Sequence, residues 1–244
     1  MTIPQSRLLM INSDDRDSGT HNNFRVSINN YRLDRTLQLS LTGATFLNSE
    51  FNIKTGFNTF SYEVDATPYS VVIPIGQYSS TELIAYLDAN APTLTTTLTA
   101  NSNFFQFVTS GTDLSIFGEA SGTTMFRILG ITQDNTASGN TKTADTIPNL
   151  SGLALVNVSS NALGASNSIS SDSNHAHIIS TVPVPNDVDF GERVTYNSDT
   201  TNDLDNITYL TEQNIRNIDI QLLDQDLNEC QLQTNIVLVF KIIS

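Results

Sequence analysis

The sequence predicts an all-β protein, an antiparallel single jelly-roll sandwich with two short helices and long loops. About ten short segments alternate apolar and polar residues with the period of two that marks a half-buried strand. Only 15% of the 244 residues are charged and 39% are hydrophobic, while serine, threonine and asparagine are abundant. This composition is typical of β-sandwiches with long loops. Long helical patterns and β–α–β alternation are missing, which favours an antiparallel sandwich with jelly-roll topology.

The C-terminal part of the chain gives the strongest strand signal. In residues 214–223, Ile218, Ile220 and Leu222 alternate with polar residues, so one face of this strand should be buried. Residues 234–243 are β-branched and almost wholly apolar apart from Lys241, which predicts a central strand covered on both faces. A polar turn at residues 224–229 separates the two strands, and together they are expected to form a closing hairpin.

The remaining strands are expected upstream of this pair, in segments that share the alternating or β-branched pattern. They are residues 24–29, 37–42, 60–64, 69–75, 93–99, 104–108, 114–117, 153–158 and 175–184. Residues 7–11 before them form a short apolar segment.

Two helices interrupt the strands. Ser79 and Glu82 have the spacing of a capping box, Leu83, Ile84 and Leu87 supply an apolar face, and residues 90–92 end the first helix. A second helical turn is expected at residues 123–129, closed by Gly130 in the C′ position.

The domain prediction is an N-terminal arm at residues 1–22 and one jelly-roll domain at residues 23–244. Within that domain, residues 132–174 form a loop-rich segment, apart from the strand at 153–158. Residues 186–211 are expected to form a long acidic connection with few apolar anchors.

The net charge of −14 disfavours binding to nucleic-acid backbones, and no direct sequence-specific nucleic-acid binding is expected. The charge is uneven, because five of the eight arginines lie in the first 35 residues: Arg7, Arg16, Arg25, Arg32 and Arg35. One interpretation is an ordinary N-terminus beside a solvated acidic surface. The other is an N-terminal arm that contacts acidic surfaces of neighbouring subunits.

The chain has one cysteine, Cys230, so an internal disulfide is not expected. The N-terminal apolar run is too short for a signal peptide, which predicts intracellular synthesis without export. A stretch of the roughly 20 apolar residues that a membrane span needs is also missing.

Metal, cofactor and catalytic sites are not predicted. Asp224, Asp226 and Asn228 resemble the start of a calcium loop, but Glu229 replaces the turn glycine and Asn235 the final glutamate, which favours a polar turn. His175 and His177 could share one strand face, but zinc needs more ligands and His21 is distant in sequence. Without a G-x-S-x-G motif, a suitable histidine or a glycine-rich phosphate loop, an enzyme is not expected.

The most distinctive polar motif is the cluster Asp14, Asp15, Arg16 and Asp17. It can be interpreted as a turn held by internal ion pairs. It can also be interpreted, together with Arg7, as a subunit interface, and these five residues are the candidate functional residues of the chain.

Four blocks of sequence together resemble the penton proteins, the single jelly-roll minor capsid proteins of virophages, Polinton-like elements and large double-stranded DNA viruses. The first is I-N-S-D-D-R-D-S-G at residues 11–19, followed by the strand N-F-R-V-S-I-N. The others are V-V-I-P-I-G-Q-Y-S-S-T-E-L at 71–83, R-I-L-G-I at 127–131, and the final strands from residue 218. The chain differs in its last turn, where relatives often have Asp-x-x-Gly, and residues 132–174 have no matching counterpart.

The resemblance implies an upright eight-stranded jelly roll, five copies of which occupy each fivefold vertex of an icosahedral capsid in the virion. The implied partners are the other copies of a homopentamer and neighbouring major capsid protein subunits, which the N-terminal arm contacts. The alternative is a jelly-roll receptor- or carbohydrate-binding module, against which the lack of tryptophan counts. A cupin-type enzyme would need a histidine-rich metal site, and the chain has three scattered histidines.

Overall fold

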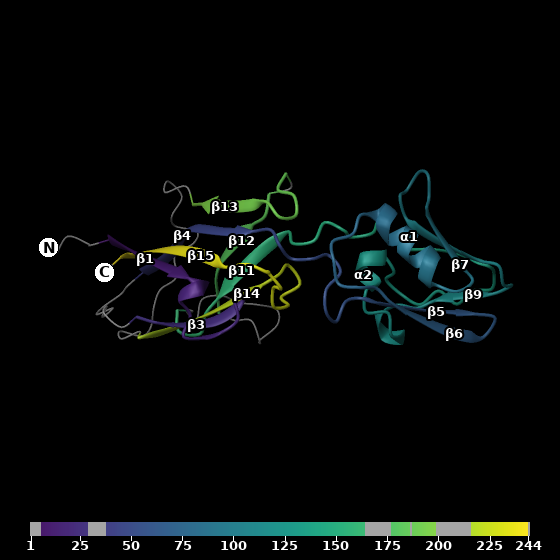
Figure 1. Cartoon of the computed structure of the whole chain (residues 1–244), viewed down its shortest axis with the longest axis horizontal. Helices are drawn as coiled ribbons and strands as arrows, with labels where there is room; N and C mark the ends of the chain where they lie inside the picture. The colour runs from purple at the N-terminus through teal and green to yellow at the C-terminus, as the bar shows by residue number, and fades with distance from the viewer. Residues whose placement is uncertain (1–5, 29–37, 164–176, 186, 199–215, 244) are drawn as a thin grey trace. The chain divides into compact units, whose positions relative to one another are not determined.

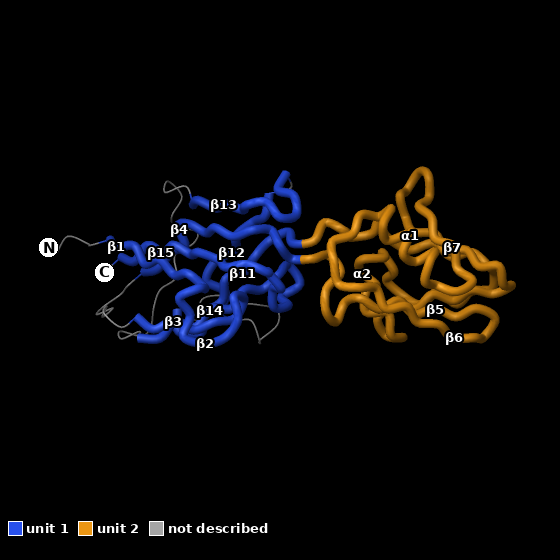
Figure 2. The backbone as a smooth tube through the Cα atoms, in the orientation of Figure 1, with its two compact units in different colours: residues 1–50, 153–244 blue, residues 51–152 orange. Residues whose placement is uncertain are grey.

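The computed structural model describes residues 6–28, 38–163, 177–185, 187–198 and 216–243. The chain divides into two compact units, of which unit 1 comprises residues 1–50 and 153–244 and unit 2 comprises residues 51–152 (Figure 2). This division corrects the prediction of one domain at residues 23–244. Strands of both units show the same alternation of apolar and polar residues, so the pattern does not mark the boundary between two separate cores.

Unit 1 is built from two antiparallel sheets (Figure 1). The first sheet has the order β1–β15–β4–β13, with bounds Ser6–Asn12, Ile236–Ile243, Gln38–Leu47 and Arg193–Asn197. The second sheet has the order β12–β11–β14–β3–β2, with bounds Ile178–Pro183, Leu155–Ser159, Asn217–Leu223, Asn23–Ser27 and Ser18–Gly19.

This strand order is that of a jelly roll. If β1, β3, β4, β11, β12, β13, β14 and β15 are lettered B to I in chain order, the sheets read B–I–D–G and F–E–H–C, the two halves of a double Greek key. The predicted fold class is therefore confirmed, and unit 2 lies in the connection between strands D and E.

The predicted closing hairpin is wrong, because β14 and β15 belong to opposite sheets. β14 pairs with β3 and β11, while β15 pairs with β1 and β4. The Asp224 carboxylate organises the turn between them, accepting hydrogen bonds from the backbone N–H groups of Asp226 and Asn228 at 2.9 Å. Alternation within each strand predicts which face is buried but not which sheet the strand joins.

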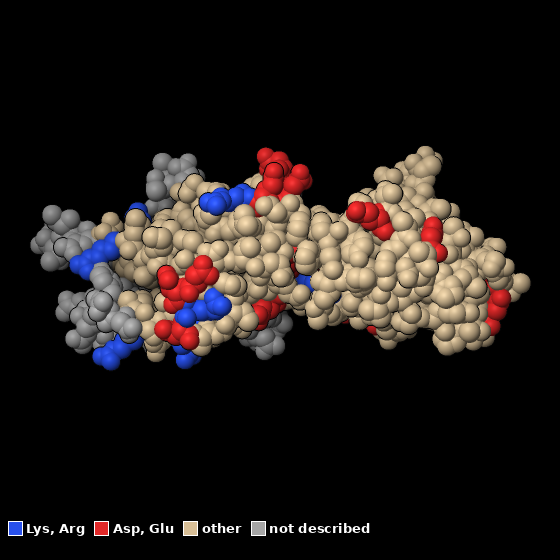
Figure 3. Space-filling model, viewed as in Figure 1, with Lys and Arg blue, Asp and Glu red and all other residues tan. Residues whose placement is uncertain are grey.

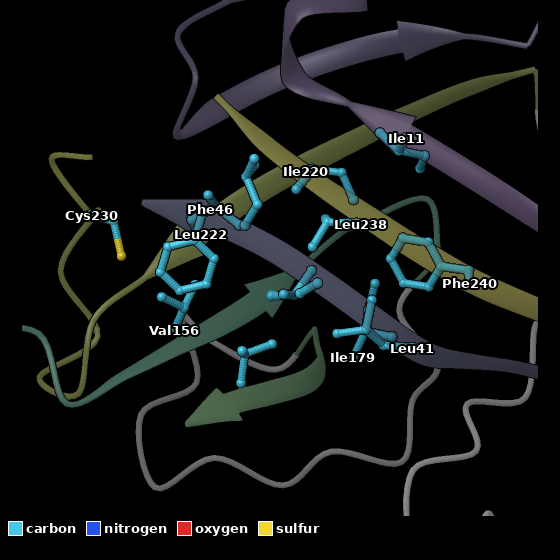
Figure 4. Close-up of a cluster of buried hydrophobic side chains, with 14 of the residues drawn as sticks. Ile11, Leu41, Phe46, Val156, Ile179, Ile220, Leu222, Cys230, Leu238 and Phe240 are labelled. Carbon is cyan, nitrogen blue, oxygen red and sulfur yellow. The ribbon is translucent and has the colours of Figure 1, made fainter. Parts of the chain in front are cut away.

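β15 lies between two other strands, as predicted for a central strand, yet the prediction that both its faces are covered is wrong within one chain. Ile236, Leu238, Phe240 and Ile242 are buried, whereas the alternate residues are half-buried. Buried side chains from both sheets meet between the layers to form the core of unit 1 (Figure 4). They include Ile11, Leu41, Phe46, Val156, Ile179, Ile220, Leu222, Cys230, Leu238 and Phe240.

The N-terminal residues that the structure describes do not form a free arm. β1 pairs with β15 in antiparallel register from Ser6 opposite Ile243 to Asn12 opposite Val237, and Ile11 is buried in the core. The predicted arm at residues 1–22 is therefore corrected from residue 6 onward, because the partner strand that recruits β1 is more than 200 residues away in sequence.

Unit 2 contains two three-stranded sheets and two helices. One sheet has the order β6–β5–β9, with bounds Thr67–Val72, Thr59–Val64 and Leu114–Ile116, and the other has the order β10–β8–β7, with bounds Thr141–Thr143, Phe105–Thr109 and Leu94–Leu98. The stacked rings of Phe60 and Tyr62 lie in its core, and burial raises the pKa of Tyr62 to about 12.

Both predicted helices are confirmed. α1 (Ser80–Asn90) begins with the reciprocal capping box of Ser79 and Glu82. α2 (Phe126–Leu129) ends at Gly130, whose φ of 74° is left-handed. Two single-turn 3₁₀ helices, η1 (Ser13–Asp15) and η2 (Glu119–Ser121), complete the described helical elements.

The two ends of unit 2 are held close together by Asn52. Its side-chain amide donates hydrogen bonds to the carbonyl oxygens of Tyr78 at 2.7 Å and Leu150 at 3.1 Å, while its side-chain oxygen accepts one from the Tyr78 N–H at 3.0 Å. Asn52 is buried, so these bonds satisfy polar atoms that have little access to water.

Four of the described strands were not predicted. β1 and β2 lie within the expected N-terminal arm. β10 lies in the segment expected to be an exposed loop, and β13 lies in the predicted acidic connection, where Val194 is its one fully buried side chain. Other parts of these predictions, including His175, residues 164–174 and residues 199–211, lie outside the described residues.

Candidate interface on the jelly roll

The described residues of unit 1 offer polar turns and exposed sheet faces. They contain no group of three or more histidine, cysteine, aspartate or glutamate side chains placed to hold a metal ion. Neither described helix has the length and apolar run needed to cross a bilayer.

The first candidate surface is the turn between β1 and β3, which Ser13 anchors to the sheet. Ser13 is buried, and its hydroxyl oxygen accepts a hydrogen bond from the Ile236 N–H at 3.0 Å. The same oxygen lies 3.1 Å from His21 Nδ1. The Asn12 side-chain oxygen caps η1 by accepting from the Asp14 N–H at 3.0 Å. The turn is therefore fixed in place by the strand that it follows.

Arg16 serves the turn itself. Its guanidinium donates hydrogen bonds to the Ser13 carbonyl at 2.8 Å and to the Gly19 carbonyl at 3.1 Å. Gly19 has a φ of 95°, and a Cβ there would lie 2.1 Å from the Asn23 carbonyl oxygen, so this position requires glycine. Arg16 thus holds the turn through backbone carbonyls rather than through the ion pairs with aspartates that the sequence suggested.

The three aspartates of the motif present charge outward. Asp14, Asp15 and Asp17 are all exposed, and a carboxylate oxygen of Asp14 lies 3.7 Å from His21 Nδ1. His21 was not predicted to belong here, although it lies only two residues after Gly19 in the sequence. The motif therefore combines an internal basic group with an acidic outer surface.

Arg7 does not join this turn. It is an exposed residue near the start of β1 and lies opposite Ile242, whereas the turn follows Asn12 at the other end of the strand. Five residues of extended chain separate Arg7 from Asn12, which is roughly 16 Å. The structure brings Asp14, Asp15, Arg16 and Asp17 together and leaves Arg7 apart.

The second candidate surface is the outer face of the first sheet, which the sequence did not single out. Leu8 and Met10 on the edge strand β1 are 72% and 69% exposed. Met10 lies opposite Val239 of β15, which is half-buried on the same face. The signal was present in the sequence, because β1 and β15 each carry apolar residues at positions that face away from the core.

The third surface is a polar hollow of about 270 Å³ on unit 1. It is lined by Asn23, Ser159, Ser160, Asn161, His177, Asp219, Ile220 and Gln221. These side chains supply carboxylate, amide and hydroxyl groups but no aromatic platform of the kind that sugar-binding faces favour.

Asp219 holds the loop beside this hollow. It accepts hydrogen bonds from the backbone N–H groups of Asn161 at 3.0 Å and Ala162 at 2.9 Å. Partial burial acts to raise the pKa of Asp219, but the hydrogen bonds from Asn161 and Ala162 outweigh it, so the net pKa is lowered. Asp219 therefore acts as a structural anchor whose lone pairs are already used.

Comparisons with known proteins find similarity in structure but not in sequence. No protein-family model and no curated protein matches the chain. A crystal structure of the mavirus penton protein is similar to this chain with a TM-score of 0.47 and 8% sequence identity. The match covers 98% of this chain and 99% of the mavirus chain. A chain in the cryo-EM structure of the Sputnik virophage is similar with a TM-score of 0.43 and 10% sequence identity. The match covers 100% of this chain and 98% of the Sputnik chain. This chain is thus similar, along nearly its whole length, to these two virophage chains.

Proposed function

We propose that this protein is a structural minor capsid protein that forms the pentameric vertex of an icosahedral double-stranded DNA virus or virophage capsid. In this role the protein has no substrate and acts through its edges, turns and loops.

The observation that carries the proposal is the coincidence of the penton-like sequence blocks with defined structural elements. The block at residues 11–19 contains the turn that Ser13 and Arg16 hold. The block at 71–83 ends in the capping box of α1, and the block at 127–131 contains the left-handed Gly130 after α2. Each block that specifies a turn or a cap depends on particular residues at fixed spacing, so composition alone does not account for these blocks.

The jelly-roll order of unit 1 supports the same function, since vertex proteins of the resembled family are expected to be single jelly rolls. A ring of five identical copies uses two different surfaces on each copy, which close by rotation. In our proposal the partners are other copies of the chain and neighbouring major capsid protein subunits, and the protein resides at the capsid vertex.

For the contact with the major capsid protein, we assign the exposed carboxylates of Asp14, Asp15 and Asp17. Arg16 has a positioning role because its guanidinium is bound to the carbonyls of its own turn. Arg7, at the far end of β1, belongs to a separate part of the interface.

Co-expression with the major capsid protein tests the function. We expect the wild-type chain to enter particles at their vertices and to show the mass of five copies by light scattering after size exclusion, alone or with its partner. A strict monomer that binds glycans on an array and never enters particles would contradict the proposal and favour a receptor- or carbohydrate-binding module.

A triple variant, Asp14→Asn with Asp15→Asn and Asp17→Asn, tests the assigned turn. We expect it to fold normally and to enter particles at least several-fold less than wild type. The matched control is Glu63→Gln with Glu119→Gln, which removes two carboxylates from unit 2. Equal incorporation of the triple variant and this control would remove the turn from the interface.

A further inference from the structure

We propose that the outer face of the β1–β15–β4–β13 sheet binds a second copy of this chain. The inference rests on the proposed vertex function and deepens it, because it assigns one of the two surfaces that a closed ring requires.

The composition of β15 is the first reason. A strand that is apolar on both sides is normally covered on both sides. Here Ile236, Leu238, Phe240 and Ile242 fill the core, while Val237, Val239 and Ile243 remain half-buried on the opposite face. The chain itself therefore covers only one side of its most apolar strand.

The edge strand β1 extends this apolar surface. Leu8 and Met10 are the most exposed large hydrophobic residues among those described, at 72% and 69%. Cross-strand pairing puts Met10 beside Val239, and Val239 in turn lies opposite Gly43 of β4. A Cβ at Gly43 would be 3.6 Å from the Val239 side chain, so the small residue leaves the top of Val239 accessible. Contiguous exposed apolar surface of this kind marks interaction sites.

The charge of the sheet identifies the occupant. Arg193 and Lys241 alternate with core-facing residues of β13 and β15, so they lie on the outer face, whereas Arg7 falls on the core side of β1, opposite Ile242. None of the four strands contains an acidic residue, in a chain whose net charge is −14. Figure 3 shows the contrast within unit 1, where acidic side chains gather on the loop that leads into β13. A surface with positive charge around an apolar centre complements the acidic remainder of the same chain.

The same charges argue for a head-to-tail contact. If two copies met through identical faces, Arg193 and Lys241 of one copy would approach the same groups of the other, and like charges repel. Contact between this face and a different, acidic surface of the next copy avoids that repulsion. Repeated by rotation, such a contact closes into a ring.

The area of this face limits how tightly two copies can bind through it. Eight residues of β15 span roughly 26 Å and four strands roughly 19 Å, so the face covers at most about 500 Å². Stable interfaces usually bury about 800 Å² on each partner. A single pairwise contact through this face should therefore be weak, and adjoining segments or ring closure must add to it.

The first experiment removes the apolar centre. In the full chain, Leu8→Asp with Met10→Asp should lower the assembled fraction at least tenfold, measured by sedimentation velocity across a concentration series and by incorporation into particles with the major capsid protein. The matched control is Val72→Asp with Ile147→Asp, two hydrophobic residues of unit 2 that are 60% and 65% exposed. Circular dichroism melting curves should show that both variants fold.

The outcomes separate the two proposals. If wild type assembles and the Leu8 and Met10 variant assembles equally well, the face is not the contact, although the vertex function stands. If wild type neither assembles nor enters particles, the vertex function itself fails.

The second experiment remains informative if the first variant does not fold. Placing p-benzoyl-L-phenylalanine at position 10 in the full chain, followed by illumination of the assembled protein, should give covalent multimers of this chain. Mass spectrometry should map the attachment to a part of the neighbouring copy outside the β1–β15–β4–β13 face. Attachment to β1 or β15 of the neighbour, or to the major capsid protein alone, or no cross-link at all, would overturn the proposal.

Discussion

The hydroxyl oxygen of Ser13 accepts a hydrogen bond from the backbone N–H of Ile236 at 3.0 Å, although 222 residues lie between them in the chain. Both residues are buried, so the bond joins the first turn of the jelly roll to the start of its last strand without competition from water.

Replacement of Ser13 by alanine should therefore destabilise unit 1. Ser13→Ala leaves the Ile236 N–H buried and unpaired, which costs about 1–3 kcal/mol of the free energy of unfolding. Urea denaturation measures this loss, and Ser18→Ala, at an exposed residue of β2, serves as the control with little expected change. An unchanged unfolding midpoint for Ser13→Ala would show that the bond does not form in solution.

Deletion of residues 1–20 gives a stronger form of this prediction. A free arm could be removed without loss of fold, whereas this deletion takes away β1, Ser13 and the buried Ile11. We expect the truncated protein to unfold at lower urea concentration, and loss of a buried isoleucine alone costs about 2–5 kcal/mol. A truncation as stable as wild type would restore the interpretation of these residues as an arm.

The core face of β14 can be tested at Ile220. Ile220 is fully buried between the two sheets, so Ile220→Asp places an unpaired carboxylate in the core and should cost roughly 4 kcal/mol or more. Gln221→Glu adds a charge at the next residue, which faces outward, and should change stability by less than about 1 kcal/mol. Similar thermal unfolding curves for the two variants would contradict the observed register.

Two glycines of unit 2 form a matched pair. Gly130 and Gly56 both have positive φ, at 74° and 84°, so alanine carries the cost of a left-handed backbone at either site. At Gly130 the added Cβ would also lie 2.2 Å from the Thr146 carbonyl oxygen, whereas at Gly56 it meets nothing within 4 Å. Gly56→Ala should cost about 1–2 kcal/mol, and Gly130→Ala clearly more, as chemical denaturation would show. Equal losses would mean that the Thr146 carbonyl moves freely aside.

The carboxylate of Asp219 should make a pH-dependent contribution to the free energy of unfolding. Its pKa is lowered in the folded protein, so its carboxylate stabilises the fold above the unfolded value of about 3.9, and this contribution is lost as the pH falls through the lower folded pKa. Asp219→Asn should be less stable than wild type at neutral pH by about 1 kcal/mol, a figure reduced for the partial exposure of the group. The difference should shrink as the pH is lowered from neutral to below about 3.9.

Melting temperatures of Asp219→Asn and wild type across this pH range measure the effect. Asp17→Asn, at an exposed carboxylate of the β1–β3 turn, is the control. A difference between wild type and Asp219→Asn that is constant with pH would contradict an ionised anchor.

Local patterns in the sequence were sufficient to predict most of the helices and strands. Ile218, Ile220 and Leu222 alternate because one face of β14 packs on the core, and Ser79 with Glu82 predicts the start of α1 because a capping box closes within three residues. β13 escaped prediction because Val194 is its single fully buried side chain, which is too few for a visible period.

Features that depend on distant partners could not be predicted in this way. The membership of Ile11 and Ser13 in the core depends on β15, and the separation of β14 and β15 into opposite sheets depends on β3 and β1. For the candidate interface, the sequence identified the Asp14–Asp17 motif, but not the role of Arg16 within it or the exposed Leu8 and Met10, since exposure is a property of the assembled sheet.

The hydrogen bond from Asn52 to Leu150 has a consequence for how the chain folds. Unit 2 is continuous in sequence, so it can fold before β4 and β11 find their places, and its two ends then stay close together. When β4 and β11 pair within the jelly roll, the connection of about 100 residues then behaves like a loop of about five residues. The entropic free-energy cost of closing this loop falls by about 2–3 kcal/mol. An inserted sequence whose two ends lie far apart would not lower this cost. The distance between the two ends of an insert, more than the composition of the insert, therefore determines which inserts the jelly roll tolerates between β4 and β11.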